Sequence, residues 1–331
     1  MNILFTSVGR RCELLKDFRQ ALGDKVRMVV TDNSPFAPAP AFADAVYGVP
    51  LINHEDYIPK ILEICKKEKI DAITTLIDPE ISILADNRDK FEELGVTVLA
   101  PYKETADLCF DKYEMFKYLS KNGIPTVLTF GSFADFKVSY DKGEISFPVF
   151  VKPRTGSGSV GARKVENIEL LEELTARDSS LIIQEFMDGK DMDADIYVDT
   201  ITHEPVAIFS KKKISTTIGG ANKTISFKDD ALFEFVKNAM KVFKFNGPLD
   251  MDIFYKDGQY YLSEINPRFG GAYLHAFGAG VDFPSLIYKN VIEKKANDEI
   301  IGQYDEDVCM LMYDSVVIEK LADLKNRMQE V

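Results

Sequence analysis

The chain has 331 residues, of which 46% are hydrophobic and 28% are charged, and its formal net charge is −13. This length predicts two or three domains rather than one small core, and the composition is that of a soluble globular protein. The acidity argues against a general nucleic-acid binder, which needs a large basic surface. The four cysteines and three histidines are scattered, which indicates neither a disulfide framework nor a zinc site.

Apolar runs are short throughout. None approaches the ~18–20 residues of a membrane span, and no signal-peptide pattern precedes the first of them. We therefore expect a reduced, cytoplasmic protein.

The first ~100 residues alternate between strand-like and helix-like segments. Apolar runs at 1–8 and 26–32 flank a segment with apolar residues at helical spacing. The same alternation continues through strand-like runs at 71–78 and 96–101, a helical pattern with Ile58, Ile61, Leu62 and Cys65 on one face, and a second helical pattern at 79–95. Strand–helix–strand order of this kind predicts a parallel α/β unit, the opening of a doubly wound sheet.

The pattern changes after this unit. Asp111 is placed to cap a helix that stops near Gly123, and strand-like runs follow at 147–152 and 181–186. From Ala194 onward strands dominate, and the sequence MDIFYKDGQYYLSEI predicts a hairpin. These features predict an α+β region with antiparallel sheets, and residues 318–331 read as a charged amphipathic helix that caps the surface.

A glycine-rich segment, KPRTGSGSVGAR, spans residues 152–163. It lacks the Gly-Lys-Ser/Thr of a Walker loop. It contains the G-x-G-x-x-G of a dinucleotide-binding turn, but the following residues read as a strand, and Asn167 begins the next helix. Two interpretations remain open for the segment alone: a hairpin-like flap whose backbone N–H groups hold phosphates, or a flexible surface turn.

Two further motifs accompany this segment, QEFMDGKD at 184–191 and EINPRFGG at 264–271. Together the three resemble the ATP-grasp family, and the match is close to its carbamoyl-phosphate-synthase-like branch. The resemblance covers nearly the whole chain. It implies a pre-ATP-grasp, Rossmann-like domain at 1–105, a small or lid subdomain at 106–187, and a large subdomain with a C-terminal helix at 188–331.

The hairpin predicts a metal site. If its turn lies near Gly258, Asp252 is opposite Glu264, and period-two alternation places Asn266 on the same face. Carboxylate and amide oxygens suit Mg²⁺, or Mn²⁺. The resemblance assigns metal binding to Glu264 and Asn266, whereas Asp252 stands where this branch often has glutamine. Ordinary surface acids on an exposed hairpin are the alternative.

The resemblance also implies which cations face the phosphates. The resemblance implies that Arg268 faces the transferred phosphoryl group, where positive charge stabilises the developing negative charge. Lys152 and Lys112 correspond to the two lysines that reach the nucleotide phosphates. For each of these, a solvated surface side chain is the alternative.

The remaining nucleotide contacts follow from the same resemblance. The flap contributes Gly156, Ser157, Gly158 and Ser159. The hinge that hydrogen-bonds adenine is formed by Gln184, Glu185, Phe186 and Met187. Asp191 matches the acid that grips the ribose hydroxyls, although the family often has the longer glutamate there.

The residues expected to meet the substrates lie in two places. Lys213 and Lys223 belong to a segment, 211–224, that resembles the substrate-side loop of this branch, with a solvated charge run as the alternative. Asp78 and Glu80 follow a strand of the first domain, and strand ends of open α/β sheets face the ligand crevice. These acids are placed to meet an amine, or to cap a helix.

The implied activity is that of an ATP-dependent ligase. A carboxylate or bicarbonate attacks the γ-phosphate of ATP, and an amine or ammonia then attacks the resulting acyl-phosphate. Alternatives are a carbamoyl-phosphate synthase large-subunit fragment or paralogue, with an amidotransferase partner if it is a split component, and a non-catalytic ATP-binding regulatory module. A Rossmann oxidoreductase is disfavoured, because only Gly9 stands at the first strand–helix turn. A homodimer is a family-level expectation.

Overall fold

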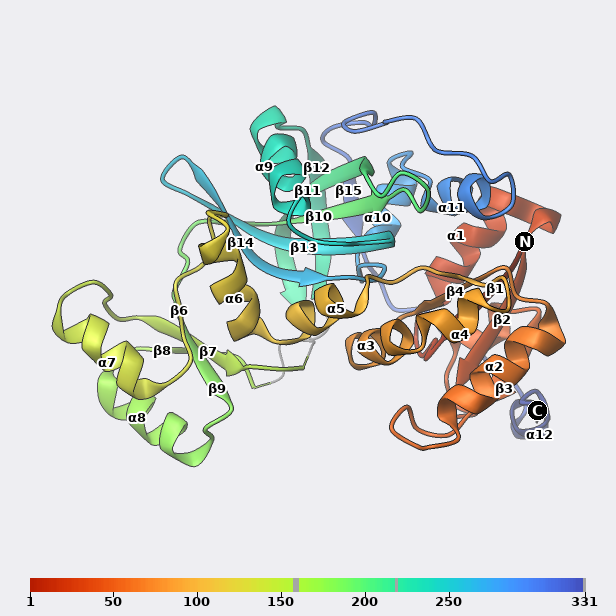
Figure 1. The fold of residues 1–331 in the computed structure, drawn as a ribbon, viewed down its shortest axis with the longest axis horizontal. Coiled ribbons are helices and arrows are strands. Elements are labelled where there is room, and N and C mark those ends of the chain that lie inside the picture. The colour runs from red at the N-terminus through yellow and green to blue at the C-terminus, as the bar shows by residue number, and fades with distance from the viewer. Residues whose placement is uncertain (157–160, 218–219, 330–331) are drawn as a thin grey trace.

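Three β-sheets organise the part of the chain that the structure describes. The computed structural model describes residues 1–156, 161–217 and 220–329, and the three sheets follow one another along the chain. In Figure 1 the N-terminal sheet lies on the right, a small sheet with two helices lies on the left, and the largest sheet lies between them. The predicted fold class, a parallel α/β sheet followed by antiparallel sheets, is confirmed.

The N-terminal sheet is parallel and has the strand order β3-β2-β1-β4-β5. Its strands are β1 (Asn2–Thr6), β2 (Arg27–Asp32), β3 (Ala45–Gly48), β4 (Ala72–Thr75) and β5 (Thr97–Val98). Helices cover both faces, so the strands read as continuous apolar runs rather than alternating ones. The strand order reverses between β1 and β4, and a ligand crevice is expected beyond the carboxyl ends of those two strands.

The helices of this domain divide between two cores. They are α1 (Cys12–Leu22), α2 (Tyr57–Glu68), α3 (Asp78–Asp86) and α4 (Arg88–Glu92), with 3-10 turns at Gly23–Lys25 and Ala39–Phe42. Residues of α2, α3 and α4 pack on one face of the sheet. On the other face, α1 packs against β1 and β2 and also belongs to the core of the largest sheet. This shared core joins the first domain to the rest of the chain.

The small sheet is antiparallel, with the order β6-β9-β7-β8, and has a core of its own. Its elements are β6 (Thr129–Phe130), α7 (Phe133–Asp141), β7 (Val149–Pro153), β8 (Arg163–Val165), α8 (Ile168–Arg177) and β9 (Leu181–Glu185). Strands β7 and β8 pair antiparallel on either side of the glycine segment. The described strands therefore form a hairpin, as predicted, and not the strand–helix turn of a dinucleotide fingerprint.

Two helices connect the first domain to the small sheet, α5 (Lys103–Phe110) and α6 (Lys112–Lys121). The Asp111 side chain accepts hydrogen bonds from the backbone N–H groups of Tyr113 and Glu114, which confirms it as the N-cap of α6. This cap fixes where α6 begins, and so it positions Lys112, the first residue of the helix.

The largest sheet is antiparallel, with the order β14-β13-β10-β11-β12-β15. Its strands are β10 (Lys190–Val198), β11 (Pro205–Thr217), β12 (Gly220–Phe227), β13 (Gly247–Lys256), β14 (Gln259–Asn266) and β15 (Cys309–Leu311), and its helices are α9 (Asp230–Met240), α10 (Tyr273–Gly278) and α11 (Phe283–Val291). The β13–β14 hairpin turns at Asp257 and Gly258, both with positive φ. An Asp-Gly pair is favoured in such a turn, so the predicted hairpin is confirmed.

The C-terminal helix is shorter than predicted. It is α12 (Leu321–Asn326), not 318–331, and α3 and α4 likewise replace the single helix expected at 79–95. Tertiary contacts oppose the helical pattern: the Gln329 N–H donates to the Val46 carbonyl at 2.9 Å, and the Gly48 N–H donates to the Gln329 carbonyl at 3.2 Å. These bonds hold the last described residue against β3, where α12 lies in Figure 1.

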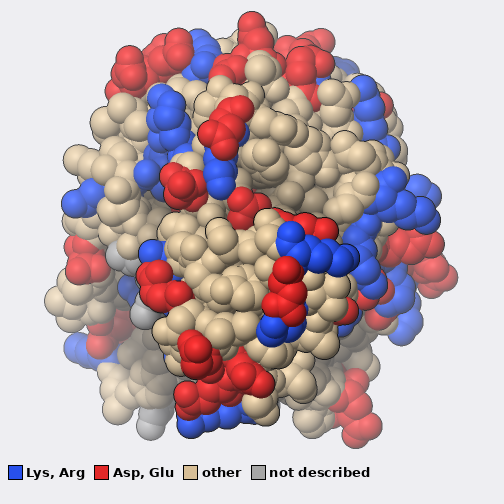
Figure 2. All heavy atoms as spheres, turned by 90° about the vertical axis from the view of Figure 1, so that its left-hand side faces the viewer, with Lys and Arg blue, Asp and Glu red and all other residues tan. Residues whose placement is uncertain are grey.

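Surface charge is mixed at the end of the molecule that carries the small sheet. Figure 2 shows Lys and Arg side chains interspersed with Asp and Glu on that face. Within residues 1–156, 161–217 and 220–329, no helix has the length and apolar composition needed to cross a membrane.

Candidate active site

Glu264 lies between two lysines that come from different elements. Strand β14 carries Glu264, β7 carries Lys152 near its end, and α6 begins at Lys112. The Nζ atoms of Lys152 and Lys112 each lie 3.5 Å from a carboxylate oxygen of Glu264. Lys112 also donates to the carbonyl of Gly156, within the glycine-rich segment, at 2.6 Å. Burial and the neighbouring Lys112 ammonium lower the pKa of Lys152, although Glu264 opposes this shift.

The hairpin places the three predicted metal ligands together. Asp252 is directly opposite Glu264 across the β13–β14 pair. The Asn266 Nδ2 donates to Asp252 Oδ2 at 3.2 Å, so all three side chains share one face of the sheet. The donor set consists of two carboxylates and one amide oxygen, which is the chemistry of a hard-cation site. These residues therefore fit a magnesium ion, although metal binding by them stays a prediction.

A strip of five aspartates continues this face across the central strands. Asp191, Asp193 and Asp195 alternate along β10, and the last two pair with Asp252 and Asp250 of β13. The sequence KDMDADIYV contains the signal for this strip, because every second residue carries a carboxylate. The sequence interpretation used only Asp191 and so missed the rest of the β10 set.

Two lysines of β11 balance part of this charge. Lys213 Nζ lies 2.5 Å from Asp252 Oδ1, 2.7 Å from Asp193 Oδ1 and 2.9 Å from Asp191 Oδ1. Burial acts to raise the pKa of Asp252, but the Lys213 ammonium, a hydrogen bond with Asp193 and the Lys152 ammonium together lower that pKa below its usual range. The same carboxylates raise the pKa of Lys213 above its usual value despite burial. The ammonium is therefore held within this cluster.

Lys211 is the more deeply buried of the two β11 lysines. Its fully buried Nζ pairs with Asp195 and lies 3.7 Å from Asp250. A Cβ atom on Gly270 would lie 2.8 Å from Asp195 Oδ1 and 3.0 Å from Asp250 Cγ. The two carboxylates thus pack directly on the backbone of the EINPRFGG segment. Position 270 requires glycine because a Cβ atom would have no room.

Arg268 is tied to the first domain. Its Nε lies 2.9 Å from Asp78 Oδ1, and a second guanidinium nitrogen donates to Asp78 Oδ2 at 3.1 Å. Arg11, which follows β1, donates to the carbonyls of Phe269 and Gly270 at 3.0 and 2.9 Å. Burial and the nearby Arg268 lower the pKa of Arg11 to about 10. Sequence analysis missed this contact, which holds the EINPRFGG segment at the carboxyl edge of the parallel sheet.

Glu80 occupies a closed environment beside Asp78. It is fully buried and accepts hydrogen bonds from Ser7 Oγ at 2.7 Å, from Thr75 Oγ1 at 2.6 Å and from the Tyr57 hydroxyl. Burial and the Glu80 carboxylate raise the pKa of Tyr57 above its usual value. These bonds connect the ends of β1 and β4, so Glu80 organises the crevice, and its contact with an amine substrate stays a prediction.

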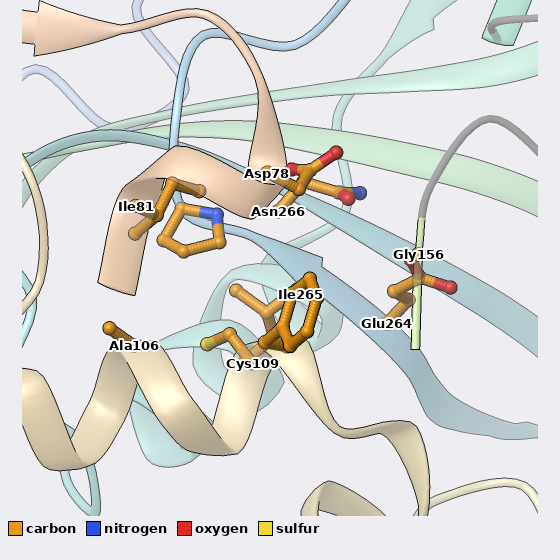
Figure 3. A pocket seen from close by; sticks show the side chains of 10 residues that line it. Asp78, Ile81, Ala106, Cys109, Gly156, Glu264, Ile265 and Asn266 are labelled. Atoms are coloured by element: carbon orange, nitrogen blue, oxygen red, sulfur yellow. The ribbon is translucent and has the colours of Figure 1, made fainter. Parts of the chain in front are cut away.

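A small pocket lies between the first domain and β14 (Figure 3). Asp78 and Asn266 meet at one end, and Glu264 lies beside Gly156 at the other. Its apolar wall includes Ile81, Ala106, Cys109 and Ile265. The pocket therefore joins the acids of the crevice to the lysine-bound Glu264.

Comparison with known proteins identifies the family of this chain. Residues 3–99 match the model of the PylC-like N-terminal domain, and residues 109–272 match the ATP-grasp domain model. The chain belongs to the ATP-grasp superfamily.

The similar curated proteins are ligases and synthases of several kinds. The chain is 28% identical over 293 residues to phosphoribosylamine–glycine ligase of Fusobacterium nucleatum, covering 76% of this chain and 66% of that protein. It is 24% identical over 253 residues to the arginine-specific carbamoyl phosphate synthase large chain of Geobacillus stearothermophilus, covering 72% of this chain and 24% of that protein. The match to D-alanine–D-alanine ligase of Francisella philomiragia is 26% over 221 residues and covers 61% and 73%.

Solved structures share the fold. L-amino acid ligase from Bacillus licheniformis superposes with a TM-score of 0.67 at 20% identity, covering 90% of this chain and 75% of that one. N5-carboxyaminoimidazole synthetase from Staphylococcus aureus, complexed with ADP, gives a TM-score of 0.71 at 16% identity and covers 90% and 78%. At these identities the likeness establishes the ATP-grasp fold.

The predicted adenine hinge of this ATP-grasp chain connects two sheets. Gln184 and Glu185 end β9 of the small sheet, and β10 of the largest sheet begins at Lys190. Gln184 is buried and donates to Thr129 Oγ1 at 2.9 Å. A Cβ atom on Gly189 would lie only 2.4 Å from the Tyr255 carbonyl, so the hinge passes close to β13. Phe186 and Met187 lie in this connection, partly exposed.

The remaining predicted residues are Lys213 and Lys223 of the 211–224 segment and three residues of the glycine-rich segment. Lys213 is opposite Thr224 in the β11–β12 pair, so the neighbouring Lys223 points to the other face of the sheet, where it is exposed. The structure thus separates the two lysines that were expected to meet one anion. Ser157, Gly158 and Ser159 lie outside the described residues.

Proposed function

We propose that this ATP-grasp chain is a ligase that uses Mg-ATP to join a carboxylate, or bicarbonate, to an amine or ammonia through an acyl-phosphate. The observation that carries the proposal is the convergence on Glu264. Two lysines from separate elements contact its carboxylate, and Asn266 extends the same face toward Arg268. Cations, hard oxygen donors and an arginine are groups that stabilise the charge developing in phosphoryl transfer.

Each side chain has a distinct part in the proposed reaction. Lys112 and Lys152 bind and orient the phosphates of ATP, and the hinge at 184–187 takes the adenine. Arg268 neutralises the negative charge that develops as the substrate carboxylate attacks the γ-phosphate. Charge neutralisation and positioning supply the catalysis, so the site needs no covalent nucleophile.

The metal site of the proposal consists of Glu264 and Asn266, with Asp252 as a third candidate. When bound, the ion would act as a Lewis acid on the phosphate oxygens. The protein's own contribution is to hold these oxygens on the rigid β13–β14 hairpin, where backbone pairing fixes their separation. Sites built on strands position such groups more accurately than sites on loops.

The experiment measures release of ADP and phosphate from Mg-ATP with pooled carboxylates and pooled amines. We expect release to depend on both pools and to fall by about a hundredfold or more in Glu264→Gln. Glu234→Gln is the matched control, since its exposed carboxylate lies 3.9 Å from Lys237 on α9. Absence of Mg-ATP binding to the unmodified protein would refute the proposal.

A second candidate is a carbamoyl-phosphate-synthase-like reaction that uses bicarbonate and ammonia. It is favoured by the matches to carbamoyl phosphate synthase large chains, although the chain spans only about a quarter of their length. Release that requires bicarbonate and ammonia alone would support it and would call for an amidotransferase partner.

A regulatory module is the third outcome of the same assay. Such a module would bind Mg-ATP without turnover in any pool, and the unmodified protein would then resemble Glu264→Gln. Size-exclusion chromatography of the same sample tests the expected homodimer.

A further inference from the structure

Lys213 and three aspartates form a closed cluster beside the proposed metal site. The cluster consists of Lys213 with Asp191, Asp193 and Asp252, and its carboxylate oxygens lie within 4.8 Å of one another. The Lys213 ammonium donates a hydrogen bond to Asp252 and lies within ion-pair distance of Asp191 and Asp193. Nine-tenths of the Lys213 side chain is removed from solvent, at 11% exposure. The lysine therefore fills the position at which the three carboxylates converge.

The same oxygens would otherwise suit a divalent cation. Three carboxylates offer up to six oxygen atoms, the ligand type and number that Mg²⁺ or Mn²⁺ prefers. Burying three like charges together is unfavourable without a cation between them. The Lys213 ammonium is that cation, so a divalent ion could enter the cluster only by displacing it.

The position of Asp252 connects the cluster to the proposed reaction. One carboxylate oxygen, Oδ1, contacts Lys213 at 2.5 Å, and the other, Oδ2, accepts from Asn266 Nδ2 at 3.2 Å. Both oxygens of this candidate metal ligand are thus engaged by the protein. Glu264, by contrast, has its lysine partners at 3.5 Å.

We propose that Lys213 is a resident cation that keeps the Asp191–Asp193–Asp252 cluster from binding a divalent metal ion in the nucleotide-free protein. Lys213 is then a positioning residue: it occupies one oxygen of Asp252, so that Glu264 and Asn266 would be the residues left to hold the ion. Metal binding at the site would then depend on the nucleotide. This inference deepens the proposed function and rests on it for its catalytic meaning.

The test measures Mn²⁺ binding to the nucleotide-free protein by electron paramagnetic resonance of the free ion. We expect Lys213→Met to bind Mn²⁺ about tenfold more tightly than the unmodified protein, because it vacates the cluster and removes a repelling charge. Lys212→Met is the matched control: it lies on the same strand, is exposed and points to the opposite face. Addition of Asp193→Asn should abolish the gain, since Asp193 is not part of the Glu264–Asn266 pair.

A second variant guards against failure to fold. Lys213→Gln keeps two N–H donors for the carboxylates while it removes the charge, and its Mn²⁺ affinity should also rise. Equal Mn²⁺ affinity of folded Lys213→Gln and the unmodified protein would overturn the proposal. The measurement contains no nucleotide, carboxylate or amine. The proposal for Lys213 can therefore be refuted while Mg-ATP turnover is observed, and it can be supported when no turnover is observed.

Discussion

Gly270 provides a stringent test of the buried ion pairs beneath the EINPRFGG segment. Replacement by alanine would put a Cβ atom 2.8 Å from Asp195 Oδ1 and 3.0 Å from Asp250 Cγ. Aspartate is a short side chain, and Lys211 holds both carboxylates from a fully buried position. The strain cannot be relieved by swinging a flexible side chain into solvent, so either the Gly270 backbone or the ion pairs must shift.

The expected cost combines two effects. Overpacking of a close-packed interior costs about 1–3 kcal/mol, and weakening a buried ion pair adds to it, up to about 3–5 kcal/mol if one partner is lost. We expect Gly270→Ala to lower the free energy of unfolding by about 2–3 kcal/mol, because the pairs shift without being lost. If the 331-residue chain unfolds as one cooperative unit, the thermal midpoint should fall by about 3–4 °C.

The assay is thermal unfolding followed by far-ultraviolet circular dichroism, with Gly278→Ala as the matched control. Gly278 ends α10, and a Cβ atom there would meet nothing within 4 Å. Alanine is also the better helix former, so the control should unfold at or slightly above the wild-type midpoint. Equal midpoints for the two variants would show that the carboxylates yield freely and would refute the reasoning.

Three further predictions address the phosphate contacts, catalysis and pH. Lys152→Met should weaken ADP binding by about 10–100-fold in calorimetry, because it removes a charge-assisted hydrogen bond. Lys117→Met, which removes an exposed lysine of α6, should leave ADP binding unchanged. Arg268→Met should lower kcat by about 10²–10³-fold with little change in nucleotide affinity; a loss confined to nucleotide affinity would contradict its role. Burial raises the pKa of Asp17 to about 7. Between pH ~4 and ~7 the folded state therefore keeps a proton that the unfolded chain has released. The free energy of unfolding then falls as pH rises through this range. Asp17→Asn should therefore unfold at the wild-type temperature near pH ~4 and at a higher one at pH ~8, and a constant difference across this range would be inconsistent with the shift.

Local patterns were enough to predict the hairpin that carries the metal candidates. The Asp-Gly turn sets the register of β13 against β14, and side-chain alternation then places Glu264 opposite Asp252. The caps at Asp111 and Asn167 were equally readable, because a capping side chain acts within three residues of itself. Features decided over such short distances need no knowledge of the tertiary structure.

The partners of Lys213 and Arg268 could not be predicted in this way. Lys213 meets Asp252 only because β10 lies between β11 and β13 in the sheet, and that order is set by packing across the whole domain. Arg268 meets Asp78 across 190 residues of sequence. The C-terminal segment failed for the same reason: its helical pattern is weaker than the backbone bonds that hold Gln329 against β3. Long-range pairing overrides local propensity wherever the two conflict.

Charged groups assigned to the proposed reaction are already paired within the protein. Glu264 contacts Lys112 and Lys152, Arg268 contacts Asp78, and Asp252 contacts Lys213. Under the proposed function, ligand binding is therefore an exchange of partners: the lysines leave Glu264 for phosphates, and Glu264 is released for the metal. Each exchange made alone would leave a buried charge without its partner, at a cost of about 1–3 kcal/mol or more. The nucleotide phosphates would replace Glu264 as the partner of the two lysines, and the metal would replace the lysines as the partner of Glu264. For that reason the site favours binding of nucleotide and metal together over binding of either alone.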